Sequence, residues 1–274
     1  MGIQKKSIMN NLLEGKRGII FGALDERSIA WKVAENCHAQ GAKIILTNAP
    51  IALRMGEINK LAAACNTEVI PADATSVEDL QKLLEQSQEK LGGKIDFILH
   101  SIGMSVNVRK NRPYTDLNYE FLNKTLDVSA ISLHKLLQTA YQMDAISEGG
   151  SVVALTYIAA QRAYSFYSDM ADAKAMLESI VRSFGYHYGV KNKVRINSVS
   201  QSPTATSAGS GIQGFDKFFG FADKMSPLGN ASADDCAKFC TMLFSDFSKM
   251  VTMQNLFHDG GYSMTGITES VLNS

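Results

Sequence analysis

The sequence lacks an excess of charge of either sign and any long hydrophobic run. Its 27 Lys and Arg residues balance 27 Asp and Glu residues, without a strongly basic stretch, which argues against nucleic acid as the main partner. No apolar run approaches the length that crosses a bilayer. The N-terminus carries a few positive charges but lacks the apolar core of a secretory signal. We therefore expect a cytoplasmic protein that does not insert into membranes.

Cysteine is scarce as well. The four cysteines are Cys37, Cys65, Cys236 and Cys240, and none forms a CxxC pair. Cys236 and Cys240 lie on an expected helix with no histidine near them in sequence. This pattern differs from zinc-binding and disulfide-rich frameworks. We predict four small buried thiols in a reducing compartment and no metal site.

What the sequence does have is an alternation of strand-like and helix-like apolar segments. Hydrophobic residues make up 45% and charged residues 20% of the chain, as in globular proteins with a large core. The expected strands are 17–21, 43–47, 68–72, 94–100, 151–155, 194–200 and 253–259. The expected helices are 28–41, 51–66, 77–91, 121–141, 170–188 and 232–244, with a loop at 104–116. This order predicts the α/β class: a single Rossmann-like, doubly wound domain over residues 1–274, with a seven-stranded parallel sheet.

The first strand–helix–strand unit resembles a dinucleotide-binding unit in outline, although the motif G-x-G-x-x-G is absent. Gly22 would allow a tight turn near a cofactor. Ser28 would cap the following helix, whose N-terminal amides would face a pyrophosphate. Asp73, at the end of the expected third strand, could accept a hydrogen bond from an adenine amino group. It could equally be a helix N-cap or turn residue.

The stretch 156–174 carries the strongest chemical signal. Tyr167 and Lys174 are seven residues apart, about two helical turns, which predicts side chains on one helix face. A neighbouring cation would lower the pKa of the phenol, and the pair could donate a proton or stabilise an oxyanion. The alternative is a surface tyrosine and a solvated lysine on an ordinary helix.

A segment rich in small residues and then in aromatic residues follows Pro203. We predict a substrate-binding lid at about 204–226, in which small residues contact a ligand and aromatic residues close over it. The four apolar lid residues would be Phe215, Phe218, Phe219 and Met225. The alternative is an ordinary connection between a strand and a helix.

Together these motifs resemble the short-chain dehydrogenase/reductase superfamily over nearly the whole chain, and within it the bacterial enoyl-acyl carrier protein reductases. The resemblance rests on Ser28-Ile29-Ala30 after Gly-x5, on His100-Ser101-Ile102-Gly103, on Tyr157 with Tyr167-x6-Lys174, and on His258-Asp259-Gly260-Gly261. Ordinary superfamily members have a Tyr-x3-Lys motif and an upstream serine. Met170 and Tyr157 occupy those two positions here, which disfavours an ordinary carbonyl reductase.

The resemblance implies a cytoplasmic NADH-dependent enzyme of fatty acid biosynthesis that reduces trans-2-enoyl thioesters on acyl carrier protein, and it implies a homotetramer. The implied catalytic residues are Tyr157, Tyr167 and Lys174. The implied substrate contacts are Ser105, Tyr157 and Tyr167. The implied cofactor-binding residues are Gly22, Ser28, Ile29, Asp73, Ala74, Ser101, Ile102, Gly103, Lys174, Thr204, Ala205, Thr206, Ser207 and Ala208.

Several alternatives remain open at the level of sequence. Asn48 and Ala49, after the second strand, provide neither an acid that selects NADH nor an arginine that accepts a 2′-phosphate, so NADPH is not excluded. A share of Tyr157 in proton delivery is also open. Gln201-Ser202-Pro203 replaces the Ala-Gly-Pro common in the family. The rival functions are a reductase of carbonyls or other alkenes and a dinucleotide-binding sensor or scaffold without activity.

Overall fold

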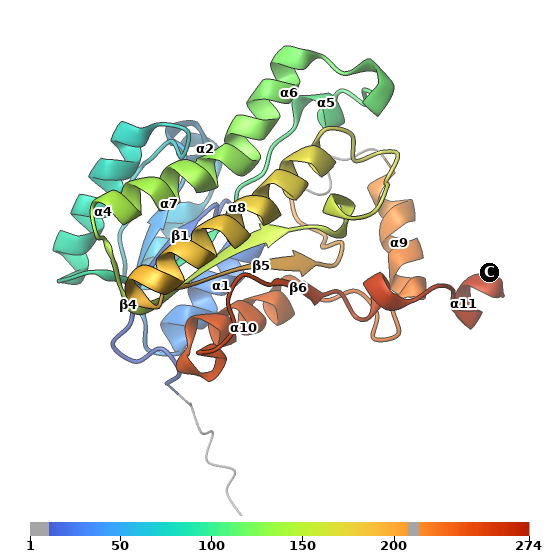
Figure 1. Ribbon diagram of the computed structural model, residues 1–274. Helices are drawn as coiled ribbons and strands as arrows, with labels where there is room; N and C mark the ends of the chain where they lie inside the picture. Colours follow the sequence, from blue (N-terminus) through green and yellow to red (C-terminus); the bar gives the residue numbers. More distant parts are fainter. Residues whose placement is uncertain (1–10, 208–213, 274) are drawn as a thin grey trace, which may run out of the picture.

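A computed structural model describes residues 11–207 and 214–273 of the chain. Its centre is a parallel sheet of six strands in the order β2-β1-β3-β4-β5-β6 (Figure 1). The strands are β1 (Arg17–Phe21), β2 (Lys43–Thr47), β3 (Ile95–His100), β4 (Ile146–Thr156), β5 (Arg195–Gln201) and β6 (Asn255–His258). After β1 the chain places β2 on one side and β3 on the other. Ligands of such sheets bind outside the carboxyl ends of the strands, where the strand order reverses.

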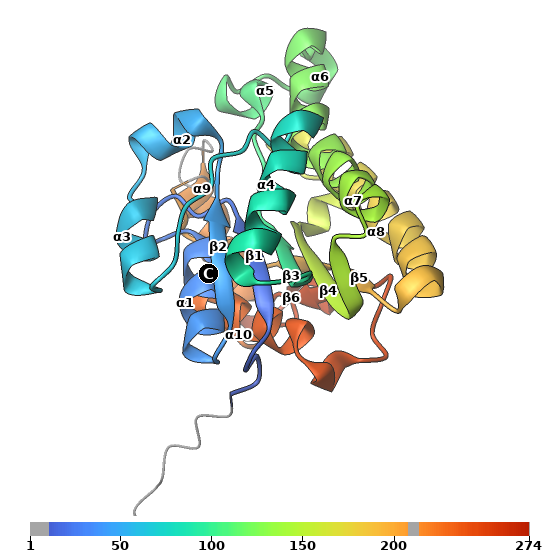
Figure 2. The ribbon, with the colours of Figure 1, turned by 90° about the vertical axis from the view of Figure 1, so that its left-hand side faces the viewer.

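Helices cover both faces of the sheet (Figure 2). The helices are α1 (Ile29–Ala39), α2 (Pro50–Met55), α3 (Ile58–Ala64), α4 (Val77–Leu91), α5 (Val106–Arg109), α6 (Tyr119–Leu126), α7 (Ser132–Gln142), α8 (Met170–Asn192), α9 (Phe215–Met225), α10 (Ala233–Phe244) and α11 (Glu269–Leu272). Helices α4, α7 and α8 contribute to one core, and α1, α3 and α10 to the other. Within the described ranges, no helix is both long and apolar enough to cross a membrane.

The strands are apolar on both faces because both faces are covered by helices. Successive strand residues alternate between the two cores. The core under α4, α7 and α8 takes Ile19, Ile98, Val152 and Ile196, whereas the core under α1, α3 and α10 takes Ile20, Leu99, Val153 and Val199. Beyond the carboxyl ends of β4 and β5, α9 and the α5–α6 pair stand clear of these layers (Figure 1). The additional helices therefore gather at the end of the sheet where a ligand is expected.

The prediction of a strand at 68–72, the third of the seven expected strands, is wrong. This segment runs beside β2, where Leu46 donates to the Glu68 carbonyl and Ile70 donates to the Leu46 carbonyl. Its one regular bridge joins Leu46 and Val69. The pairing continues to the Ala72 N–H, which donates to the Asn48 carbonyl at 3.1 Å, but the segment does not form a regular strand. The sheet of the described residues therefore has six strands.

Two predicted helices are interrupted. The helix expected at 51–66 is divided into α2 and α3 at Gly56, where an added Cβ would lie 2.7 Å from the Leu24 carbonyl oxygen. Glycine lets this turn approach the loop after β1, to which Glu57 N–H also donates at 2.8 Å. The helix expected at 121–141 contains a π-helical turn, Asp127–Ile131.

The segment expected as a loop at 104–116 is also more ordered than predicted, because it contains α5 and the short 3₁₀ helix Tyr114–Asp116. Within the π-helical turn, the Ser129 hydroxyl accepts from the Met104 N–H at 2.9 Å and donates to the Met104 carbonyl at 3.1 Å. A π turn of this kind often occurs beside a functional site. Here the π turn binds the backbone of Met104, in the loop after β3, through the Ser129 hydroxyl.

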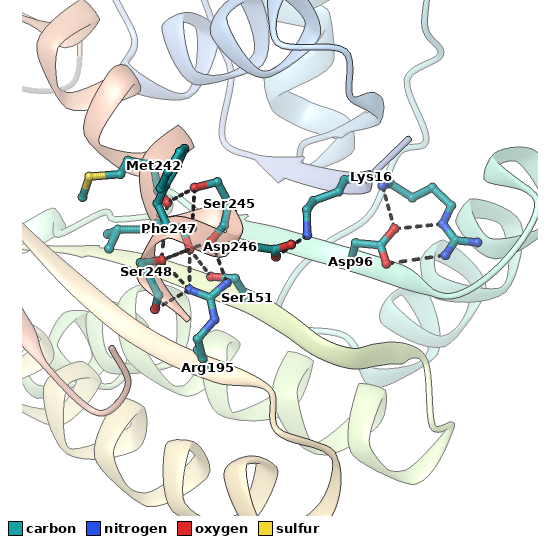
Figure 3. Close-up of polar contacts among 11 residues, drawn as sticks. Lys16, Asp96, Ser151, Arg195, Met242, Ser245, Asp246, Phe247 and Ser248 are labelled. Carbon is teal, nitrogen blue, oxygen red and sulfur yellow. Dashed lines mark hydrogen bonds and ion pairs between the residues drawn. The ribbon is translucent and has the colours of Figure 1, made fainter. Parts of the chain in front are cut away.

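The opposite end of the sheet is held by buried charge (Figure 3). Arg195, at the start of β5, donates to the last turn of α10 and the residues after it. Its acceptors are the carbonyls of Leu243 at 2.8 Å, Ser245 at 3.2 Å and Ser248 at 3.1 Å, and the Ser248 hydroxyl. Nearby, Arg17 pairs with Asp96 at 2.9 Å and Lys16 with Asp246 at 2.8 Å. Arg195 thus binds the carbonyls at and after the end of α10 together with the hydroxyls of Ser151 and Ser248.

All four cysteines are buried free thiols. Burial raises the pKa of Cys37 to about 12 and the pKa of Cys65 to about 11. Thiols with such pKa values are protonated and poorly nucleophilic at neutral pH. The cysteines therefore act as small core side chains, as predicted.

Candidate active site

The candidate site lies where β3 and β4 end. His100, Ser101, Ile102 and Gly103 close β3, and Tyr157 follows β4 directly. Helix α8 then passes these strand ends and brings Lys174 to them. An added Cβ on Gly103 would lie 3.7 Å from the Lys174 ammonium nitrogen. The structure therefore brings together the motifs that the sequence carries after β3 and β4.

Lys174 is buried, with 7% of its surface exposed. Its ammonium donates to the Leu155 carbonyl at 2.8 Å, at the end of β4. Burial lowers the pKa of Lys174 to about 8, and the negative charge of Glu178 opposes this shift. An ammonium has three donors, so Lys174 can hold a polar ligand beside Gly103 as well as the carbonyl.

Tyr167 lies in the turn before α8, and its carbonyl accepts from the Met170 N–H at 3.1 Å. The prediction that Tyr167 and Lys174 share one helix face is wrong, because Ser168 has a φ of +46° and the helix begins at Met170. Burial raises the pKa of Tyr167 above its ordinary value. The predicted lowering of this pKa by Lys174 is also wrong, since desolvation dominates. Tyr167 is therefore a neutral hydrogen-bond donor.

Tyr157 lies against two other tyrosines. Its ring centroid is 5.1 Å from that of Tyr167 and 5.6 Å from that of Tyr164. Burial, followed by the neighbouring phenols, raises the pKa of Tyr157. Its hydroxyl is buried and makes no hydrogen bond of ordinary geometry with the described residues. A buried hydroxyl of this kind costs stability, and a bound polar ligand would satisfy it.

His100 lies behind the site and is neutral. Burial, followed by the positive charge of Lys174, lowers the pKa of His100 to about 3. Its Nε2 is 2.9 Å from the Ser132 hydroxyl, which itself donates to the Val128 carbonyl at 2.7 Å. Nε2 therefore carries the proton. His100 adds no charge to the site.

Ser105, the predicted substrate contact, has its hydroxyl engaged elsewhere. The hydroxyl donates to the buried Asp169 carboxylate at 2.6 Å and accepts from the Val108 N–H at 2.9 Å, where it caps α5. Asn107 donates to the other Asp169 oxygen at 2.8 Å. Ser105 thus joins the loop after β3 to the turn that carries Tyr167.

Gly22 ends β1 with a φ of +93° and lies against the end of β3. An added Cβ would lie 2.0 Å from the Ser101 carbonyl oxygen. The predicted tight turn is confirmed, and it is required by the approach of Ser101. Ile102 packs against the core under α4, α7 and α8, so the His100–Gly103 motif also has a structural role.

We expect Gly22→Ala to lower the free energy of unfolding by about 2–4 kcal/mol, because the side chain would meet a backbone oxygen at a positive φ. Urea denaturation measures the loss. Gly189→Ala is the matched control, since nothing lies within 4 Å of its added Cβ on α8. The control should be neutral or stabilise by about 1 kcal/mol. Equal effects of the two substitutions would contradict this role of Gly22.

Ser28 occupies the N-cap position of α1, but its side chain does not cap the helix. Its hydroxyl donates to the Asp25 carbonyl at 2.7 Å and accepts from the Leu24 N–H at 3.3 Å. The predicted capping hydrogen bond is therefore wrong. Because the first turn of α1, beginning at Ile29, carries no acidic residue and no side-chain cap, this N-terminus suits an anion such as a pyrophosphate.

Asp73 is a turn residue. One of its carboxylate oxygens accepts from the Thr75 N–H at 2.9 Å and from the Thr75 hydroxyl at 2.8 Å. Ala74 is buried in the core under α4, α7 and α8. The N-cap of α4 is Ser76. The turn interpretation is confirmed, and a contact of Asp73 or Ala74 with adenine stays a prediction.

The segment after β5 approaches the loop after β1. The Thr204 hydroxyl donates to the Ser202 carbonyl at 3.0 Å, and the Thr206 N–H donates to the Thr204 carbonyl at 2.7 Å. Past Ala205, the Ser207 hydroxyl donates to the Asp25 carboxylate. The two loops predicted to hold a dinucleotide therefore meet. Ala208 lies outside the described residues.

Sequence reasoning missed three polar links around the site. Gln201 and His258 form a hydrogen bond of 2.8 Å between the ends of β5 and β6. Tyr164 donates to Tyr262 at 2.9 Å, and Glu178 accepts from three neighbouring side chains. Gln201 was visible as a departure from the family motif, but its partner lies 57 residues away. No local pattern indicates such pairs.

A family model described as Enoyl-(Acyl carrier protein) reductase matches residues 22–263. The Enoyl-[acyl-carrier-protein] reductase [NADH] 2 of Rhizobium meliloti (strain 1021) is 33% identical, over 94% of this chain and 96% of its own length. The crystal structure of a FabI–NADH complex from Alistipes finegoldii has 62% identity and a TM-score of 0.94, over 95% of this chain and 92% of that one. The crystal structure of the enoyl-[acyl-carrier-protein] reductase (NADH) from Aquifex aeolicus VF5 has 30% identity and a TM-score of 0.86, over 94% of this chain and 100% of that one. Motifs, fold and relatives agree, and the chain belongs to the enoyl-(acyl carrier protein) reductase family.

Proposed function

We propose that the protein reduces trans-2-enoyl thioesters carried by acyl carrier protein to saturated acyl thioesters with NADH, the last step of fatty acid elongation. The observation that carries the proposal is the arrangement at the strand ends. There the buried Lys174 ammonium lies beside Gly103, and Tyr157 with its unsatisfied hydroxyl packs against Tyr167. Such a site offers one cation and two neutral phenols to a polar ligand.

Bound NADH supplies a hydride to the β-carbon of the double bond. Negative charge then develops on the thioester oxygen, and a preorganised donor must stabilise it. We assign this role to the Tyr167 hydroxyl, whose raised pKa keeps it protonated. Tyr157 lines the acyl pocket and orients the thioester. Lys174 holds the nicotinamide ribose hydroxyls and adds positive potential.

The remaining predicted residues hold the rest of the cofactor. Gly22, Ser28 and Ile29 surround the pyrophosphate at the N-terminus of α1, whose free first turn fits an anion. The Asp73–Ala74 turn and the Ser101–Gly103 segment would hold the adenosine. Residues 204–207 would close over the phosphates and the nicotinamide. Support comes from the contact of Ser207 with Asp25 in the β1 loop.

Helix α9 is the proposed lid within the single 1–274 domain. Its Phe218 ring packs 4.8 Å from Phe166 and 5.6 Å from Tyr164, next to Tyr157. Phe215 and Phe219 face one another at 5.8 Å, and Met225 is buried at the end of the helix. An aromatic lid over the acyl chain would exclude water from the site.

The partners follow from the same proposal. Acyl carrier protein delivers the substrate, and NADH is the cofactor named for the relatives in Rhizobium meliloti and Alistipes finegoldii. We also propose a homotetramer. Support comes from exposed apolar side chains on the later half of α8, Tyr186 and Val190, and near the C-terminus, Met264 and Ile267. The cytoplasmic location stays a prediction.

The test is the loss of NADH absorbance with crotonyl and enoyl-acyl carrier protein thioesters. We expect Tyr167→Phe to lower kcat about 10²-fold while NADH affinity changes less than about twofold, because one oxyanion donor is lost. Tyr157→Phe should lower kcat/KM about tenfold, mainly through KM. Tyr119→Phe, an exposed tyrosine, is the matched control and should have no effect.

Three outcomes would contradict the proposal in different ways. Turnover of 3-oxoacyl thioesters instead of enoyl thioesters would indicate a carbonyl reductase. Tight NADH binding without turnover of any enoyl thioester would indicate a sensor or scaffold. Turnover with NADPH alone would retain the reaction and change the cofactor.

A further inference from the structure

Glu178 is a buried acid that the proposed reaction does not use. It lies on α8, and only 4% of its surface is exposed. Its carboxylate accepts hydrogen bonds from the Thr156 hydroxyl at 3.0 Å, the Gln161 amide at 3.0 Å and the Asn255 amide at 3.1 Å. All three donors are neutral and come from different parts of the chain. None of these donors carries a charge that would cancel the charge of the carboxylate.

Glu178 is one helical turn after Lys174, and both side chains reach the end of β4. Lys174 binds the carbonyl of Leu155, and Glu178 binds the side chain of Thr156, the next residue. Residues four apart on a helix lie on the same face. The carboxylate therefore acts on the ammonium through a buried region where water screens little.

The other titratable groups near Lys174 do not supply this charge. His100 on β3 is neutral, and the phenols of Tyr157 and Tyr167 are kept protonated by burial. The Asp169 carboxylate, in the turn before α8, is also bound by neutral donors, the side chains of Ser105 and Asn107, but it does not contribute to the pKa shift of Lys174, which has burial and Glu178 as its causes. Burial disfavours the charged form of Lys174, whereas the negative charge of Glu178 favours it.

We propose that Glu178 is a positioning residue whose negative charge keeps the buried Lys174 protonated. This inference rests on the proposed function, because the ammonium is the form of Lys174 that would bind the nicotinamide ribose. Without Glu178 the lysine would still pack beside Leu155 but would lose its proton at a lower pH. Glu178 thereby extends the pH range over which the site can hold its cofactor.

The experiment measures the titration of Lys174 directly, by ¹³Cε NMR of lysine-labelled full-length protein without added ligand. The signal is assigned by its absence in Lys174→Met, and it should titrate near pH 8, the pKa that burial gives this lysine. We expect Glu178→Gln to lower this midpoint by about one pH unit or more, since a charge in a poorly screened region is lost. Gln161 can rotate its amide to keep a hydrogen bond with the new side chain.

Matched variants separate charge from packing. Glu178→Asp keeps the charge, so the titration midpoint of Lys174 should fall much less than in Glu178→Gln. Asp172→Asn removes a charge from the same helix, where Asp172 accepts from the Tyr114 hydroxyl at 3.2 Å, and should shift the midpoint by less than about 0.3 unit. If Glu178→Gln does not fold, Gln161→Lys provides a second test at an exposed position. The new cation would offset Glu178 and should also lower the midpoint.

An unchanged midpoint in a folded Glu178→Gln variant overturns the proposal, even if activity falls, because the acid would then be only structural. A lowered midpoint supports it and predicts that NADH affinity is lost at a correspondingly lower pH in the variant. The NMR titration needs no substrate. A lowered midpoint in a protein that reduces no enoyl thioester would therefore contradict the proposed function and leave the role of Glu178 intact.

Discussion

Replacing Lys174 by methionine should lower kcat/KM for enoyl thioester reduction by about 10³-fold or more and weaken NADH binding. Methionine preserves most of the apolar packing but removes the ammonium that donates to Leu155 and lies beside Gly103. Losing a charged hydrogen-bond donor costs about 1.5–3 kcal/mol in binding, and losing electrostatic stabilisation in the transition state costs a further ~3–4 kcal/mol. A fluorescence titration with NADH measures the loss in binding, and initial rates measure the loss in transition-state stabilisation.

The control for this substitution is Lys191→Met on the exposed end of the same helix, where the lysine forms a surface ion pair with Asp144 at 3.4 Å. It should change the rate less than about twofold. The pH dependence is a second check. With a pKa of about 8, Lys174 is charged below that pH and loses its proton above it, so NADH affinity should fall as pH rises through 8. Retention of more than a tenth of the activity by Lys174→Met would contradict the assignment.

Replacing Arg195 by leucine should lower the free energy of unfolding by about 3–5 kcal/mol. The guanidinium satisfies the carbonyls of Leu243, Ser245 and Ser248 at the end of α10 (Figure 3). Its removal would break three charge-assisted hydrogen bonds in a buried region, and the carbonyls would keep only neutral donors, the hydroxyls of Ser151 and Ser248 and the Val251 N–H. The corresponding fall in Tm is about 5–9 °C for a domain of this size, measured by calorimetry.

Arg182→Leu is the matched control for Arg195→Leu, because Arg182 is an exposed arginine on α8. Its effect on the free energy of unfolding should stay within about 0.5 kcal/mol. Arg195→Lys should recover only part of the loss, since one ammonium cannot reproduce the planar donors of arginine. A stability loss equal to that of Arg182→Leu would show that water replaces the guanidinium at the end of α10.

Much of the fold was accessible from sequence because its signals are local. Strands β1 and β2 and helix α4 begin and end where their apolar patterns predict. Parallel strands buried on both faces appear as continuous apolar runs. Of the seven strands predicted from such runs, six are present in the structure. Gly22 could likewise be assigned to a tight turn, because glycine at the end of the first strand allows a positive φ.

The errors arose where a non-local contact decides the structure. Residues 68–72 have strand-like composition and run beside β2, but they form only one regular bridge with it, between Val69 and Leu46. Tyr167 has helical spacing from Lys174, but the helix begins three residues later at Met170. Glu178 looks like an ordinary helix residue, and only the tertiary structure brings Thr156, Gln161 and Asn255 to it.

The two edges of the sheet have different consequences for self-association. Beside β2, the 68–72 segment occupies the edge and presents Pro71, which cannot donate to a further strand. On the other side, β6 is the last strand formed by the described residues, and all four of its residues are half-buried. Addition of a strand from another molecule is therefore expected at β6 and disfavoured at the opposite edge. Edge-to-edge growth would stop after two molecules, which protects this long apolar sheet from forming fibres.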